Sequence, residues 1–155
     1  MKNTAVKFCG FTQLEDITNA VNLGVDAVGL VFYEPSPRAV TAEQACELAK
    51  AVPAFTTVAI VTQIQALKDV GACSVLLDAY HPDKFGGTGD SFDWDKIPKN
   101  SPLPIILAGG LTADNVGEAI RQTGVYGVDV SGGIESAKGV KSLAKMTGFL
   151  AKVRN

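Results

Sequence analysis

The chain has 155 residues, the length of one domain, and 46% of them are hydrophobic, so it can bury a substantial core. Fourteen lysine and arginine residues against sixteen aspartate and glutamate residues give a formal charge of −2. Because the cations are dispersed along the sequence and the apolar runs have only the length of strands, we expect neither a nucleic-acid partner nor a membrane span.

The beginning of the chain predicts a strand, a helix and a second strand. The first strand covers residues 5–9. The T-x-x-E spacing of Thr12 and Glu15 is typical of a capping box and predicts that a helix begins there. The second strand, residues 27–32, leads into a loop with two prolines in which Arg38 is the only cation.

The middle of the chain continues the alternation. Thr41 and Gln44 have the spacing of a capping box, and the helix that they begin would direct Ala45 inward. The sequence predicts a third strand over residues 56–61 and a short helical piece over residues 64–70.

Three later stretches share one plan, in which an apolar strand runs into a glycine-rich turn: residues 75–89, 104–111 and 127–135. The first delivers the carboxylate of Asp78 at its strand end and continues into Gly86-Gly87-Thr88-Gly89. Glycines let a backbone approach a ligand and direct its N–H groups at an anion. An acid beside such a loop predicts chemistry on a phosphorylated substrate.

The end of the chain predicts a helix from Thr112, a strand at Val125 and a final helix over residues 140–153. Strands that alternate with helices indicate a parallel α/β architecture, and no linker divides the chain, so we predict a single domain, residues 1–155. Cys9, Asp78 and Asp129 fall at or near the carboxyl ends of predicted strands. Ligands bind at that end in both open α/β sheets and β/α barrels.

Localisation and cysteine chemistry point to the cytoplasm. Residues 1–10 lack the apolar region and cleavage site of a secretory signal. Cys9, Cys46 and Cys73 fit neither a disulfide framework nor a zinc site, and a reducing cytoplasm suits them. Cys46 and Cys73 are interpreted as core fillers. The single histidine, His81, cannot form a metal site alone and is interpreted as a surface loop residue.

Five motifs together resemble the phosphoribosylanthranilate isomerase family: KFCGFT (7–12), GLVFYEPSPRAV (29–40), LLDAYHPDKFGGTGDSFDW (76–94), ILAGGLTADNV (106–116) and VDVSGGIESAKGVK (128–141). The resemblance implies a TIM (β/α)8-barrel and an enzyme of tryptophan biosynthesis. The reaction would be the Amadori rearrangement of N-(5-phosphoribosyl)anthranilate to 1-(2-carboxyphenylamino)-1-deoxyribulose 5-phosphate. The resemblance implies a small-molecule phosphoribosyl substrate and no metal or organic cofactor.

The chain departs from this family in the number of its repeating units. Six βα units can be recognised, whereas the barrel has eight. About 50 residues are missing, at roughly 25 per unit. Three explanations stay open: a segment of the natural chain that this sequence lacks, a true deletion covered by swapping or a homodimer, or a damaged fold. The abrupt junction near residues 59–62 favours the first.

The resemblance assigns roles in acid–base catalysis. Asp78 would be the acid that protonates the ribose ring oxygen, and Cys9 the base that removes the C2′ proton. A nearby cation or helix N-terminus would assist the Cys9 thiolate. The alternative for Cys9 is a small buried hydrophobe, but its place at a strand end before Gly10 favours catalysis. Asp129 would orient the substrate amine. The alternative for Asp129 is a structural role, in which its carboxylate accepts hydrogen bonds from backbone N–H groups at the strand end.

Binding roles are divided between a cation and the glycine-rich turns. Arg38 is interpreted as a clamp on the anthranilate carboxylate, with a solvated loop cation as the alternative. A phosphate cradle is predicted from Gly87, Thr88, Gly89, Gly109, Gly110, Ser131, Gly132 and Gly133.

Two rival functions stay open. The histidine-pathway isomerase performs the same rearrangement but is expected to use two aspartates, so Cys9 argues against it. The second rival is a non-catalytic phosphate-binding or self-associating barrel remnant.

Overall fold

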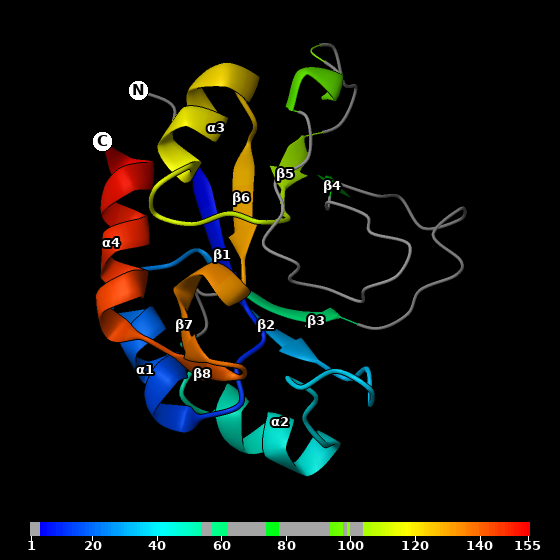
Figure 1. The fold of residues 1–155 in the computed structure, drawn as a ribbon. Coiled ribbons are helices and arrows are strands. Elements are labelled where there is room, and N and C mark those ends of the chain that lie inside the picture. Colours follow the sequence, from blue (N-terminus) through cyan, green and yellow to red (C-terminus); the bar gives the residue numbers. More distant parts are fainter. Residues whose placement is uncertain (1–3, 54–56, 62–73, 78–93, 98, 100–103) are drawn as a thin grey trace.

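Six parallel strands form the sheet in this computed structural model, which describes residues 4–53, 57–61, 74–77, 94–97, 99 and 104–155. The strands are β1 (Ala5–Cys9), β2 (Ala27–Val31), β3 (Thr57–Val61), β4 (Val75–Leu77), β5 (Ile105–Leu107) and β6 (Gly127–Val130). Their spatial order is β3-β2-β1-β6-β5-β4 (Figure 1). β1 pairs with both β2 and β6. The strands that come first and last along the chain in this sheet are therefore neighbours, as in a barrel.

Four helices accompany the sheet in the same spatial order as the strands. They are α1 (Leu14–Asn22), α2 (Ala42–Ala49), α3 (Val116–Thr123) and α4 (Leu143–Arg154). α1 contacts both α2 and α4, and α4 contacts α3 (Figure 1). Two short 3₁₀ turns are η1 (Trp94–Lys96) and η2 (Gly132–Ile134). The longest helix, α4, has 12 residues, and in the described part of the chain no helix is long and apolar enough to cross a membrane.

The main core lies between the sheet and these helices. Phe8 of β1 is fully buried and meets Phe149 of α4 edge to face, with ring centroids 6.0 Å apart and an interplanar angle of 74°. Side chains alternate along a strand, so Phe8 toward the helices places Lys7 and Cys9 on the opposite, inner face of the sheet. This alternation decides which β1 residues can reach a ligand.

The two predicted capping boxes have different outcomes. At α2 the prediction is confirmed, because the Thr41 hydroxyl accepts from the Gln44 backbone N–H and the Gln44 side chain accepts from the Thr41 N–H. At α1 the prediction is wrong. The helix begins after Gln13 without a side-chain cap, and the Thr12 hydroxyl donates to the carbonyl of Gly139, at a distance of 2.6 Å. The Thr12 hydroxyl therefore makes a long-range hydrogen bond and does not cap α1.

The final predicted helix begins later than expected. Residues before it form the antiparallel hairpin β7 (Glu135–Ala137) and β8 (Val140–Lys141), with a left-handed turn at Gly139, φ 82°. α4 then begins after Ser142, whose hydroxyl accepts from the Lys145 backbone N–H. The hairpin matters for function, since it carries two charged residues of the site described below.

α3 also begins later than predicted, at Val116 instead of Thr112. The Asn115 side chain closes a turn first, because its Oδ1 accepts from the Thr112 N–H and its Nδ2 donates to the Gly110 carbonyl. This turn fixes the loop that follows β5.

The remaining expectations concern Cys46 and several residues outside the described ranges. Cys46 is exposed on α2, so its interpretation as a core filler is wrong; the inner face of that helix is supplied by Ala45 and Leu48. Cys73, His81, the helical piece at residues 64–70, and Asp78 with the Gly86–89 loop lie outside the described residues.

Candidate active site

A cavity of about 450 Å³ lies at the carboxyl ends of β5 and β6, a size suited to a small-molecule ligand. The loop after β5, the loop after β6 and the β2–α2 loop form its walls. Its lining includes every predicted cradle residue that the structure describes: Gly109, Gly110, Ser131, Gly132 and Gly133. The structure therefore brings together two glycine-rich turns that are more than 20 residues apart in the sequence.

The glycines permit the close approach of these two loops. Gly109 and Gly110 have φ angles of 86° and 61°, in the left-handed region that glycine adopts without strain. A Cβ at Gly133 would collide with the carbonyl oxygen of Leu111. Any larger side chain at residue 133 would force the two walls of the cavity apart.

A buried ion pair stands at the inner face beside the cavity. Lys7 and Asp129 are direct partners in the parallel register of β1 and β6, and Lys7 Nζ lies 2.9 Å from Asp129 Oδ1. Their side chains are only 14% and 13% exposed. The Asp129 carboxylate is thus bound by an ammonium group. Asp129 also lines the cavity.

Cys9 completes a three-residue group with this pair. It follows Lys7 on the same face of β1, is 7% exposed, and interacts with both Lys7 and Asp129. Cys9 and Lys7 are not among the residues of the cavity wall, whereas Asp129 is. Asp129 therefore links the three-residue group to the cavity.

Burial and the two charged neighbours shift the pKa of Cys9 in opposite directions. Burial raises the pKa of the Cys9 thiol and the Asp129 charge raises it further, whereas the Lys7 ammonium lowers it. Burial would lower the pKa of Lys7, but the charges of Asp129 and Cys9 outweigh it and raise that pKa above its ordinary value. Lys7 therefore keeps its proton and is the cation that favours the Cys9 thiolate.

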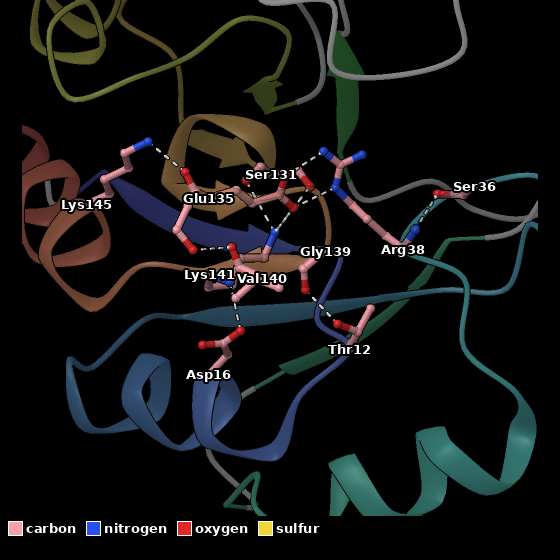
Figure 2. Close-up of polar contacts among 11 residues, drawn as sticks. Thr12, Asp16, Ser36, Arg38, Ser131, Glu135, Gly139, Val140, Lys141 and Lys145 are labelled. Atoms are coloured by element: carbon pink, nitrogen blue, oxygen red, sulfur yellow. Dashed lines mark hydrogen bonds and ion pairs between the residues drawn. The ribbon is translucent and has the colours of Figure 1, made fainter.

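Arg38 is held by Glu135, a carboxylate that was not predicted from the sequence to belong to the site. Its Nε donates to Glu135 Oε1 at 2.7 Å and its Nη2 to Glu135 Oε2 at 2.8 Å (Figure 2). The Arg38 side chain is 13% exposed, so the alternative of a solvated loop cation is wrong. Gly10 makes this position available, because a Cβ there would collide with Cδ of Arg38.

Cations from separate parts of the sequence gather around the cavity. Arg38, Lys138 and Lys145 line it, and Lys141 lies behind, bonded to Glu135. Lys7, Glu135 and Lys141 were not among the residues predicted from the sequence. The strand alternation at KFC carries a signal for Lys7, whereas the partners of Glu135 depend on the unpredicted hairpin. Within the described ranges, no group of three His, Cys, Asp or Glu side chains is arranged to hold a metal ion.

The family is decided by comparison with known proteins. A family model described as N-(5'phosphoribosyl)anthranilate (PRA) isomerase matches residues 58–152, more than half of the chain. The chain belongs to the phosphoribosylanthranilate isomerase family. The N-(5'-phosphoribosyl)anthranilate isomerase of Nitrosococcus oceani is 39% identical to it over 200 aligned positions, which cover 97% of each chain.

Solved structures of phosphoribosylanthranilate isomerases have the same fold. The Thermotoga maritima enzyme superimposes with a TM-score of 0.84 at 27% identity, covering 97% of this chain and 98% of that one. Another, with a TM-score of 0.71, 26% identity, and coverage of 97% and 98%, was solved in complex with reduced 1-(o-carboxyphenylamino)-1-deoxyribulose 5-phosphate. The predicted TIM-barrel type of fold is confirmed.

The function follows from the family. The chain is an isomerase of tryptophan biosynthesis that converts N-(5-phosphoribosyl)anthranilate to 1-(2-carboxyphenylamino)-1-deoxyribulose 5-phosphate. Both rival functions, the histidine-pathway isomerase and the non-catalytic remnant, are set aside. The 200 aligned positions exceed the 155 residues of the chain by 45, so at least that many positions of the N. oceani alignment have no residue here.

Proposed function

We propose that the Amadori rearrangement takes place in the cavity beside Asp129, with Cys9 as general base and Asp78 as general acid. The observation that carries this proposal is the arrangement of Asp129, Arg38 and the two glycine-rich turns around one cavity, next to Cys9. The cavity offers Arg38 and the glycine-rich turns to an anion, and the candidate base lies beside the cavity next to Asp129.

The reaction needs two proton transfers. Asp78 donates a proton to the ribose ring oxygen, the C1′–O bond breaks, and an iminium ion forms with the anthranilate nitrogen. Cys9 removes the proton from C2′, the electron pair of that C–H bond forms a C1′=C2′ double bond, and the C1′=N π pair returns to the nitrogen to give an enaminol. Tautomerisation then gives the ketone, so the reaction is an internal redox change with no external oxidant. Both steps are general acid–base catalysis.

Cys9 must be a thiolate to act as the base, and its surroundings make that form rare in the free protein. Burial and Asp129 raise its pKa, and Lys7 opposes them. The proposed role of Lys7 is therefore to supply the positive charge that permits proton removal. Asp129 is proposed to orient the substrate amine from its place on the cavity wall.

The two anionic ends of the substrate are proposed to occupy different walls. The phosphate lies against backbone N–H groups of Gly109, Gly110 and residues 131–133, with residues 87–89 contributing from outside the described part of the chain. The anthranilate carboxylate lies at Arg38, whose guanidinium fork matches a carboxylate. Holding both ends fixes C2′ near Cys9, which is the positional part of catalysis.

The assembly belongs to the same proposal. We place the chain in the cytoplasm as one domain, residues 1–155. In the described part of the chain, β3 and β4 each pair with one strand only, and an uncovered edge is a site of association, so we propose a homodimer. Size-exclusion chromatography with light scattering tests this, and a monomer at micromolar concentration would contradict it.

Two substitutions test the assigned roles. Asp78→Asn is expected to lower kcat by about 100-fold or more, because an amide cannot donate the proton that the ring oxygen needs. Arg38→Ala is expected to raise KM by about tenfold or more with a smaller effect on kcat, because a carboxylate clamp contributes mainly to binding. Near-normal kcat in the first variant would exclude Asp78 as the acid, and an unchanged KM in the second would remove Arg38 from substrate binding.

A further inference from the structure

The Glu135 carboxylate occupies one defined edge of the Arg38 guanidinium. A guanidinium group has five N–H bonds in a fixed plane, and two pairs of them can each hold a carboxylate. Glu135 takes the edge formed by Nε and Nη2, at 2.7 and 2.8 Å. In the described part of the chain Nη1 makes no hydrogen bond, and Arg38 lines the cavity. The edge formed by Nη1 and the second hydrogen of Nη2 is left for a ligand.

Glu135 is itself held from several sides, so the orientation of Arg38 is fixed. Lys141 Nζ donates to Glu135 Oε1 at 2.8 Å, and the Lys141 side chain is fully buried. Lys145 Nζ donates to the Glu135 backbone carbonyl at 2.6 Å (Figure 2). At the other end, the Arg38 backbone N–H donates to the Ser36 hydroxyl at 3.1 Å. Arg38 is therefore held at its backbone and at the Nε–Nη2 edge of its guanidinium.

The charges of the three side chains leave one positive charge. Arg38 and Lys141 are cations, and the Glu135 carboxylate neutralises one of them. Without Lys141, Glu135 would cancel the charge of Arg38 and remove its attraction for an anion. Burial of Lys141 beside Glu135 thus allows an acid to orient Arg38 without making it electrically neutral.

We propose that Glu135 is a positioning residue that presents the Nη1–Nη2 edge of Arg38 to the carboxylate of the substrate, while Lys141 preserves the positive charge of that edge. This inference rests on the proposed role of Arg38 as the carboxylate clamp. It assigns specificity for a carboxylated aromatic ring to three residues, two of which come from the β7–β8 hairpin.

The test compares two ligands that differ only in the carboxylate. One is reduced 1-(o-carboxyphenylamino)-1-deoxyribulose 5-phosphate, and the other is the same compound with phenyl in place of carboxyphenyl. Glu135→Gln is expected to weaken binding of the carboxylated ligand by about tenfold, because its amide N–H₂ faces the donors of Arg38 and Lys141. Binding of the ligand without the carboxylate is expected to change by less than about twofold. Isothermal titration calorimetry measures both.

Two further variants separate this effect from a general loss of structure. Glu47→Gln removes the acid of an exposed ion pair with Lys50 on α2, and both ligands are expected to bind it normally. Glu135→Asp keeps the negative charge beside Lys141 but is one methylene too short for both Arg38 bonds. It is expected to retain the thermal unfolding midpoint better than Glu135→Gln and still to lose preference for the carboxylated ligand.

The outcomes distinguish the positioning role of Glu135 from the carboxylate-clamp role of Arg38 on which it rests. If Glu135→Gln and Glu135→Asp weaken both ligands equally, or weaken neither, Glu135 does not act through Arg38 and the inference fails. If Arg38→Ala itself does not reduce the preference for the carboxylated ligand, the clamp role fails first. If Arg38→Ala and the Glu135 variants reduce the preference and their effects are not additive, both stand.

Discussion

Cys9 and Gly29 face each other across the parallel pair β1–β2, and the absence of a side chain at Gly29 makes room for the thiol. The two residues are partners in the strand register. A Cβ at Gly29 would lie 2.6 Å from Cys9 Sγ and 3.2 Å from Lys7 Cε. Real Cβ atoms do not approach that closely, so the position of the thiol depends on this glycine.

Gly29→Ala is therefore expected to displace Cys9 Sγ and to lower kcat by about tenfold or more, since catalysis is sensitive to shifts of an ångström. Overpacking would also reduce the free energy of unfolding by about 1–3 kcal/mol. Steady-state kinetics and urea unfolding measure the two effects. A normal kcat would show that the thiol position is unimportant for turnover.

Gly148→Ala provides the matched glycine control. Gly148 lies inside α4, and among the described residues an added Cβ would meet Ala113 Cβ alone, at 3.9 Å, which is an ordinary contact. Alanine is the better helix former, so the variant is expected to gain about 0.5–1 kcal/mol of unfolding free energy with unchanged kcat. A loss of stability would contradict the packing described for α4.

Lys7 and the protonation of Cys9 give a prediction about pH. Burial and then Asp129 raise the Cys9 pKa above its ordinary value of 9.0, and a base must be deprotonated to act. Because Cys9 must be deprotonated while Asp78 is protonated, we expect kcat/KM to be bell-shaped in pH, with the Cys9 pKa as one of its two apparent pKa values. Lys7→Met removes the charge that lowers the Cys9 pKa, so this apparent pKa should move to higher pH and activity at neutral pH should fall severalfold.

Lys50→Met is the control for the lysine change, because Lys50, at the C-terminal end of α2, is 69% exposed. Its pH profile is expected to match that of the unmodified protein. A Lys7→Met profile that coincides with the unmodified one, after correction for the folded fraction, would exclude Lys7 from setting the Cys9 protonation state.

Glu135 gives a prediction about stability in acid. Burial would raise its pKa, but the hydrogen bonds from Arg38 and Lys141 outweigh burial and hold the pKa below the ordinary 4.5. A carboxyl whose pKa is lowered on folding stabilises the protein above its unfolded pKa and loses that contribution as pH falls through the folded value. The stability advantage over Glu135→Gln should thus be constant above about pH 5 and shrink below about pH 4.5. Urea unfolding of both proteins at several pH values measures it; an advantage that grows in acid would contradict the ion pairs.

The sequence predicted those parts of the fold that depend on local pattern. The six strands were placed within about two residues, because apolar runs bounded by glycine and proline carry the signal directly. The α2 cap was predicted because both partners lie within three residues of each other. The α1 cap failed because Thr12 bonds to Gly139, 127 residues away, and no local pattern contains that contact.

In the site, too, residues marked by a local pattern were predicted, and residues defined by long-range contacts were not. Asp129, Arg38 and the glycines were found from residue type and position at strand ends, and five of the eight cradle residues line one cavity. Glu135 was missed because it ends the glycine-rich stretch 127–135 with no local signal of its own, and Lys141 because it falls at the beginning of the helix predicted over residues 140–153. In the structure Gly139 turns the chain into a hairpin, and the Lys141 N–H donates to Asp16. The role of such residues depends on tertiary partners that periodicity does not reveal.

The most direct test of the account is the turnover of N-(5-phosphoribosyl)anthranilate by the purified protein and by Cys9→Ala, followed by the change in anthranilate fluorescence. We expect the unmodified protein to turn the substrate over. Cys9→Ala should lose about 100-fold or more in kcat and still bind reduced 1-(o-carboxyphenylamino)-1-deoxyribulose 5-phosphate within a few-fold of the unmodified protein. Turnover by Cys9→Ala at the rate of the unmodified protein would contradict the assignment of Cys9 as the base.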